Sequence, residues 1–168
     1  GIYQGMNEAI DYAQGKYLCF LNCGDYFVDK NVLENIHKTA VENETAGIVL
    51  GDYSRKGVKI TQPSKITGFS LYRNALCHQT MFIKKEMFEK HGKYDTTFKM
   101  CADWNHTVTC FKAGEQFVHS DTVVCDYLGG GASKKKTGSD IVVKELERIR
   151  NEKFSDKERK KYNLMIKL

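Results

Sequence analysis

The sequence lacks an apolar run long enough to cross a bilayer, any internal repeat, and the close-set cysteine pairs of a zinc finger. No apolar stretch among its 168 residues approaches the roughly 20 residues of a membrane-spanning helix. Proline is nearly absent too, since Pro63 is the only one. These absences exclude a spanning helix, a repeat array and a zinc module of recognisable spacing. One ordinary domain remains, since a chain of this size buries roughly 70% of its unfolded surface.

Six cysteines are present, at positions 19, 23, 77, 101, 110 and 125, and several lie inside apolar runs. Buried, reduced thiols in a cytosolic protein explain this distribution best. A zinc site is the alternative, because cysteine and histidine are zinc ligands. Its candidate ligands are Cys19, Cys23, Cys77, His78, Cys101 and His106.

Helical and strand-like patterns alternate along the chain. Apolar spacing predicts helices over residues 2–13, 32–41, 84–91 and 103–113, with Gly15, Gly92 and Gly114 as stops. Apolar runs predict strands at 16–21, 47–52, 80–83, 116–119 and 122–127. The polar segment 53–74 is predicted to be a β-hairpin or a mobile loop. This alternation predicts an α/β fold with a mixed, mostly parallel sheet flanked by helices.

Residues 16–25, Lys-Tyr-Leu-Cys-Phe-Leu-Asn-Cys-Gly-Asp, are the most informative stretch. They form an apolar run that ends in a turn carrying one carboxylate, Asp25. Such a run fits a strand buried on both faces of a parallel sheet, and ligands bind at the carboxyl ends of these strands. Asp25 is therefore expected where a ligand would bind, although on position alone the better interpretation is a polar turn after a strand.

Residues 1–25 contain Gly-Ile-Tyr-x-x-Met-Asn, then Ala-x-Gly-Lys-Tyr-Leu-x-Phe-Leu-Asn, and then Gly-Asp. This combination resembles glycosyltransferase family 2, whose members share the nucleotide-sugar-binding GT-A fold. It implies that Asp25 is the last carboxylate of the "DXD" motif, which holds a divalent metal, Mn or Mg, on the diphosphate. The motif is degenerate here, because Cys23 and Gly24 occupy its first two positions.

A second block strengthens the resemblance. Cys-His-Gln-Thr-Met-Phe-Ile at 77–83 is followed by residues 88–95 and then by Ala-Asp-Trp at 102–104. The resemblance implies that Asp103 is the catalytic base and that His78 and Gln79 lie near the donor sugar and diphosphate. Residues 123–133 look like the family's closing strand and Gly-rich loop.

The remaining donor-site candidates are Asn22, Gly24 and Trp104. An acceptor hydroxyl needs an ionised base within hydrogen-bond reach, and Asp103 at a helix start suits this role. An ordinary N-cap is its alternative. Trp104 is expected to stack on a sugar ring or to belong to the core. His78 is a ligand-binding residue or an ordinary core or surface histidine.

The resemblance covers residues 1–133 and implies an inverting, metal-dependent, hexosyltransferase-like enzyme. It would move a sugar from a nucleotide-diphosphate sugar to a saccharide or lipid-linked acceptor, in cell-surface polysaccharide synthesis in the cytoplasm. It also implies that the N-terminal nucleobase-binding unit is lacking. We therefore expect weak nucleotide binding, an exposed sheet edge and a homodimer.

Residues 134–168 are predicted to form a basic, amphipathic helical tail, since much of the net charge of +5 lies there. The tail packs on the domain as a solvated helix or lies on an anionic membrane surface at the inner face. The alternative function is a catalytically idle binding module that contacts an anionic surface through this tail. Nucleic acid is not expected, because the charge is not concentrated with aromatic residues on one strand face.

Overall fold

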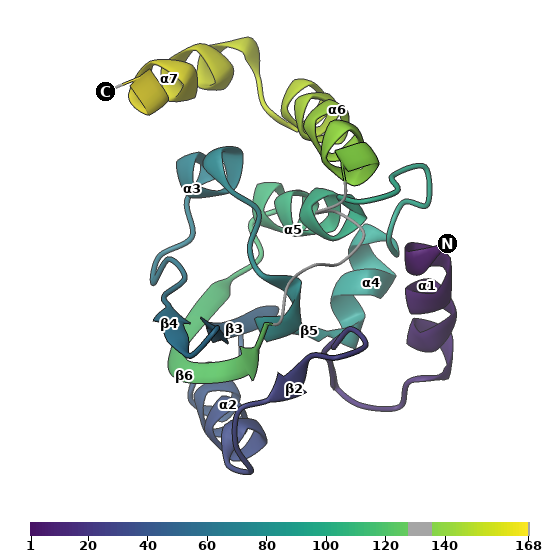
Figure 1. Cartoon of the computed structure of the whole chain (residues 1–168), viewed down its shortest axis with the longest axis vertical. Helices are drawn as coiled ribbons and strands as arrows, with labels where there is room; N and C mark the ends of the chain where they lie inside the picture. Colours follow the sequence, from purple (N-terminus) through teal and green to yellow (C-terminus); the bar gives the residue numbers. More distant parts are fainter. Residues whose placement is uncertain (128–135, 168) are drawn as a thin grey trace.

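A six-stranded mixed sheet forms the centre of the protein in the computed structural model, which describes residues 1–127 and 136–167 (Figure 1). The strand order is β1-β5-β3-β6-β2, and β4 pairs with the outer half of β3. The strands are β1 (Tyr17–Leu18), β2 (Tyr26–Phe27), β3 (Ile48–Arg55), β4 (Val58–Ile60), β5 (Met81–Lys84) and β6 (Phe117–Asp126).

The α/β class with a mixed sheet flanked by helices is confirmed, but the predicted excess of parallel pairing is wrong. Among the described strands only β3 and β6 pair in parallel, and the other four pairings are antiparallel. The reason is that β5 lies between β1 and β3 and runs against both. A short apolar run can form a parallel or an antiparallel strand equally well. The direction of the strand in the sheet therefore depends on the connections before and after it.

Helices cover both faces of this sheet (Figure 1). Alternate side chains of β3 point to opposite faces, so Ile48 and Leu50 join one core and Val49 joins the other. Helix α2 (Val32–Glu42) covers the core of Val49. The opposite core is formed with α1 (Ile2–Tyr12), α3 (Gly68–Arg73), α4 (Lys85–His91), α5 (Ala102–Lys112) and α6 (Lys136–Lys153).

Glycine ends two of the helices as predicted and fails to end a third. Gly92 after α4 and Gly114 after α5 both have positive φ, 82° and 86°. Helix α1 instead ends because Ala13 is extended, with φ −66° and ψ 133°, so the predicted stop at Gly15 is wrong.

The polar segment after β3 is a hairpin followed by a helix. Lys56 and Gly57, with φ 52° and 76°, form the two-residue turn between β3 and β4. The hairpin prediction is thus confirmed, whereas α3 was not predicted. Thr67 and Ser70 begin α3 with a reciprocal capping box. The strands predicted at 116–119 and 122–127 are one strand, β6, with register shifts against β3.

The predicted helical tail is two helices, α6 and α7 (Asp156–Lys167), and the first is packed on the domain. Ile149 and Phe154 are buried in the core shared with α5. Glu145 is buried as well, and its carboxylate accepts hydrogen bonds from the backbone N–H groups of residues 99–101. The Gly-rich loop and the predicted boundary at 133/134 lie outside the described residues. In the described part of the chain, no helix is long and apolar enough to cross a membrane.

Candidate functional site

The loop after β1 presents Asp25 through a tight turn. The N–H of Asp25 donates to the carbonyl oxygen of Asn22 over 3.0 Å, and Gly24 within the turn has φ 95°, a conformation that glycine adopts without strain. The carboxylate Oδ2 of Asp25 accepts a hydrogen bond of 2.9 Å from Nε2 of Gln79, whose side chain is buried. Gln79 lies outside the turn, so a separate segment of the chain orients the carboxylate of Asp25.

Asp103 lies in the first turn of α5, where the helix dipole favours a negative charge. Its Oδ1 accepts a hydrogen bond of 2.7 Å from the hydroxyl of Tyr3, and its Oδ2 lies 3.1 Å from Nδ1 of His78. Burial by itself raises the pKa of Asp103, but the hydrogen bonds from His78 and Tyr3 outweigh it, so the pKa lies below its ordinary value. Cys101 is the N-cap of α5, so the alternative of Asp103 as an N-cap is wrong.

The short 3₁₀ helix η1 (His78–Thr80) joins the two carboxylates. His78 contacts Asp103, and the next residue, Gln79, donates to Asp25. His78 also lies 3.2 Å from Nδ2 of Asn22 through its Nε2. With a neutral imidazole, Nδ1 donates to Asp103 and Nε2 accepts from Asn22. These contacts link six of the predicted site residues into one connected group: Asn22, Gly24, Asp25, His78, Gln79 and Asp103.

Trp104 is not part of this group. Its indole is only 2% exposed, and Nε1 donates to the carbonyl oxygen of Leu71 over 2.9 Å. A ring in this position is closed to a sugar, so its predicted stacking role does not fit, whereas the core alternative does.

A buried glutamine that was not predicted holds η1 in place. Gln62 accepts from the N–H of Cys77 over 2.7 Å through Oε1 and donates through Nε2 to Thr80 Oγ1 over 2.6 Å. Its own N–H donates to Asp52, which lies at 0% exposure between His119 and Lys59. The sequence did not indicate this role, because a glutamine in a polar segment is ordinarily exposed.

Side chains that commonly ligate metals do not cluster in the described part of the chain. No group of three or more His, Cys, Asp or Glu side chains that could hold an ion occurs among residues 1–127 and 136–167. The cysteines are free thiols, and Cys101 and Cys110 are buried. The zinc alternative therefore finds no site in this part of the chain.

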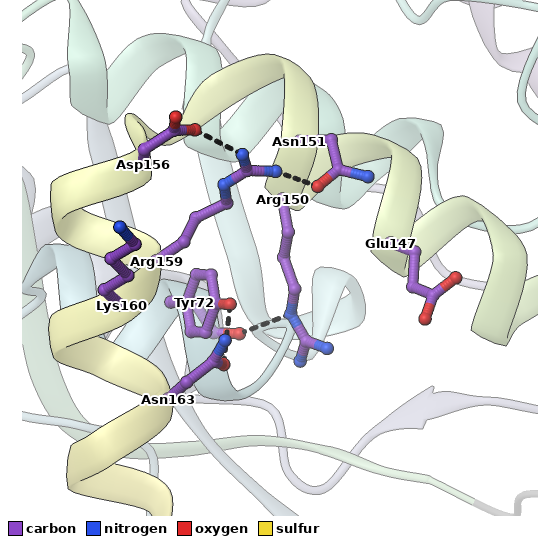
Figure 2. A pocket seen from close by; sticks show the side chains of 8 residues that line it. All are labelled: Tyr72, Glu147, Arg150, Asn151, Asp156, Arg159, Lys160 and Asn163. Carbon is purple, nitrogen blue, oxygen red and sulfur yellow. Dashed lines mark hydrogen bonds and ion pairs between the residues drawn. The ribbon is translucent and has the colours of Figure 1, made fainter.

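Neither of two pockets formed by described residues is lined by Asp25 or Asp103. The first, of about 600 Å³, lies between α3, α6 and α7. Its arginines bridge these helices: Arg159 contacts Asp156 and Asn151, while Arg150 Nε donates to the carbonyl oxygen of Tyr72 (Figure 2). We interpret this pocket as part of the packing interface between the three helices.

The second pocket, of about 520 Å³, lies between the β3–β4 hairpin and α3. It reaches Gln62 and Cys77, directly beside η1. It carries the further inference developed below.

Comparison with known proteins points to sugar transfer. The chain is 27% identical over 112 residues to PGL/p-HBAD biosynthesis glycosyltransferases of Mycobacterium bovis and Mycobacterium tuberculosis. The match covers 66% of this chain and 44% of the relatives, so the chain spans less than half of their length. No model of a protein family matches the sequence.

Solved structures share the fold. S. aureus TarS 1-349 in complex with UDP-GlcNAc matches with a TM-score of 0.65 and 13% identity, over 92% of this chain and 48% of that one. The same protein in complex with UDP matches with a TM-score of 0.62 and 15% identity, over 77% and 40%. Identity at this level shows the fold alone.

Proposed function

We propose that this chain belongs to glycosyltransferase family 2, with a GT-A fold, and that the protein transfers a sugar from a nucleotide-diphosphate sugar to an acceptor hydroxyl. The observation that carries the proposal is η1, which connects Asp103 through His78 and Asp25 through Gln79. Such a transfer needs one carboxylate beside the acceptor hydroxyl and another beside the diphosphate. These two groups lie on opposite sides of the anomeric carbon of the donor sugar. The mycobacterial relatives, which are named glycosyltransferases, support this proposal.

Asp103 is the proposed base of an inverting displacement. The acceptor hydroxyl gives its proton to the carboxylate and its oxygen forms a bond to the anomeric carbon. The bond from that carbon to the diphosphate oxygen breaks, and the nucleoside diphosphate leaves with the electron pair. The lowered pKa keeps Asp103 ionised at neutral pH, and 17% of its side chain is exposed, which leaves it accessible.

The donor side is proposed around the turn after β1. The sugar diphosphate would bind around Asp25. Its neighbours there are Gln79, which donates to Asp25, Asn22 and Gly24 in the same turn, and His78, which contacts Asn22. Asp25 is a hard oxygen donor and fits Mn or Mg, provided that the remaining ligands come from phosphate oxygens and water. Such an ion stabilises the charge that builds on the departing diphosphate.

The proposed substrates are a uridine diphosphate hexose and a saccharide or lipid-linked acceptor of a cell-surface glycan. The UDP-GlcNAc complex of TarS supports the nucleotide, and the names of the mycobacterial proteins, PGL/p-HBAD biosynthesis glycosyltransferases, support a role in biosynthesis. We place the reaction at the cytoplasmic face of the membrane.

The tail supplies the proposed membrane contact. Lys157, Lys160, Lys161 and Lys167 of α7 are exposed, and α7 has no acidic residue after Glu158. Leu164 is 63% exposed among these lysines. A basic surface with an exposed apolar side chain favours an anionic lipid surface. The same observation supports the second candidate function, a binding module that acts through its tail without catalysis.

Self-association is also proposed. β1 is two residues long and stands at the end of the strand order among the described strands. Ile2, on the neighbouring helix, is 52% exposed. A short edge strand beside apolar surface favours pairing with a second copy.

The experiment is a product screen of the complete protein. It is incubated with Mn²⁺, a panel of sugar nucleotides and a panel of alkyl glycosides, and the products are weighed by mass spectrometry. We expect one donor to extend at least one acceptor by the mass of one hexose unit. Absence of both transfer and donor hydrolysis across the panel, with anionic vesicle binding retained, would favour the binding module instead.

A further inference from the structure

The pocket between the β3–β4 hairpin and α3 has the size of a small-molecule site. Its volume of about 520 Å³ falls within the range of about 300 to 1,000 Å³ that ligand pockets span. Tyr53 and Phe69 line it, together with Thr61, Arg73 and Asn74, and Gln62 and Cys77 lie at its inner end. We refer to it as the hairpin–helix pocket.

Two aromatic rings in the pocket lining are braced from outside. Tyr53 packs against Tyr127 with ring centroids 6.1 Å apart, and Phe69 packs against Tyr162 with centroids 5.7 Å apart. Both side chains are half-buried. Rings held in this way present fixed apolar surfaces, which suit the C–H faces of a sugar ring.

The polar lining favours a neutral, hydroxyl-rich ligand over a diphosphate. Among the lining residues that the structure describes, Arg73 alone has a formal charge, whereas Thr61 and Asn74 offer a hydroxyl and an amide. A nucleotide diphosphate calls for several cations or a metal ion. Few charges, two rings and short polar groups are the composition of a saccharide site.

The inner end of the pocket adjoins η1, the short helix whose residues contact both carboxylates. Cys77 lines the pocket and immediately precedes His78, which contacts Asp103. The thiol of Cys77 lies 3.3 Å from Oε1 of Gln79, the residue that donates to Asp25. Gln62, also in the lining, anchors both ends of this turn through Cys77 and Thr80. A ligand at the inner end would therefore touch the segment that holds both carboxylates.

We propose that the hairpin–helix pocket binds the acceptor saccharide and directs its reacting hydroxyl toward Asp103. This inference rests on the proposed function, since it assigns the acceptor side of the same site. Tyr53 and Phe69 hold the ring by stacking, and Asn74 and Arg73 fix its orientation by hydrogen bonds.

The kinetic test compares transfer with donor hydrolysis in the complete protein, using the donor and alkyl glycoside found in the product screen. In Phe69→Ala and Asn74→Ala we expect the acceptor KM to rise tenfold or more. The donor KM and the rate at which water alone cleaves the donor should stay within about twofold, because water needs no pocket. Tyr12→Ala is the matched control, since Tyr12 is 85% exposed on α1 and far from this pocket in sequence.

The outcomes separate the inference from the proposed function. An unchanged acceptor KM in both variants, or a donor KM that rises instead, overturns the acceptor assignment and leaves transferase activity intact. Wild-type protein without transfer or hydrolysis overturns the proposed function itself.

A binding experiment tests the saccharide site directly, so that it can be judged even if the wild-type protein is inactive or a variant folds poorly. The 168-residue chain is titrated with methyl glycosides of glucose, galactose, rhamnose and N-acetylglucosamine and followed by ¹H–¹⁵N NMR. We expect shifts concentrated at Tyr53, Phe69 and Asn74, which disappear in Asn74→Ala. Shifts elsewhere, or none with any glycoside, overturn the saccharide site.

Discussion

Replacement of Tyr3 by phenylalanine tests the electrostatics of Asp103 with the least disturbance. The Tyr3 side chain is 7% exposed, and its hydroxyl donates to Oδ1 of Asp103 over 2.7 Å. Burial and the Asp103 charge raise the pKa of Tyr3, so the phenol stays protonated and remains the donor. Tyr3→Phe keeps the buried ring and removes only this hydrogen bond.

The size of the effect follows from that one bond. A hydrogen bond to a charged group contributes about 1.5–3 kcal/mol, and one pKa unit corresponds to about 1.4 kcal/mol. The bond favours the ionised form and so lowers the pKa of Asp103. Without it, we expect the pKa of Asp103 to rise, because one of the hydrogen bonds that oppose the effect of burial is then lost.

The assay is the pH dependence of kcat/KM for transfer, whose acid limb reports the base in the free enzyme. In Tyr3→Phe this limb should move to higher pH by about 1–2 units, while activity above the limb changes little. Tyr12→Phe, on the exposed side of the same helix, should leave the limb in place. Loss of activity at every pH with an unmoved limb would refute the assignment of Asp103 as the titrating base.

Three further predictions concern the metal, the buried histidine and the loop before α5. Asp25→Asn should weaken Mn²⁺-dependent donor binding tenfold or more by calorimetry, and an unchanged Kd would contradict the metal role. Burial and the nearby charge of His91 lower the pKa of His106 to about 4. The unfolded chain takes up this proton first, so stability should fall by up to about 3 kcal/mol as the pH drops from about 6.5 to about 4. Urea unfolding of His106→Phe should lack that slope, and a slope equal to wild type would contradict it. Glu145→Gln should lower the free energy of unfolding by about 2–4 kcal/mol, because the amide NH₂ that replaces Oε2 cannot accept from the N–H groups of Met100 and Cys101. Glu147→Gln, exposed on the same helix, is its control in thermal unfolding, and equal melting temperatures would contradict the prediction.

The sequence predicted the elements whose signals are local. Gly92 and Gly114 end helices because left-handed backbone favours glycine at these positions. The buried strand at Ile48 was evident because an apolar run between polar segments has few other solutions. The grouping of Asp25 and Asp103 was implied by the family resemblance and not by any local signal, and the structure links both residues to η1.

The parts that could not be predicted depend on contacts between distant positions. Tyr3 and Asp103 are 100 residues apart, and nothing near either residue announces the other. Gln62 is buried only because Asp52, Cys77 and Thr80 satisfy its polar groups, which compensates the cost of burying an amide. The direction of a strand could not be predicted for the same reason, since it depends on where the chain enters the sheet.

The central claim is that Asp103 acts as the base of sugar transfer, and Asp103→Asn tests it most directly. The change keeps the size of the side chain and removes its ability to accept the proton. In the complete protein, with the donor and acceptor identified by mass spectrometry, we predict that kcat falls on the order of a hundredfold or more. The donor Kd, measured by calorimetry in Mn²⁺, should stay near the wild-type value. Wild-type turnover by Asp103→Asn would contradict the account and leave Asp103 as a structural partner of His78 and Tyr3.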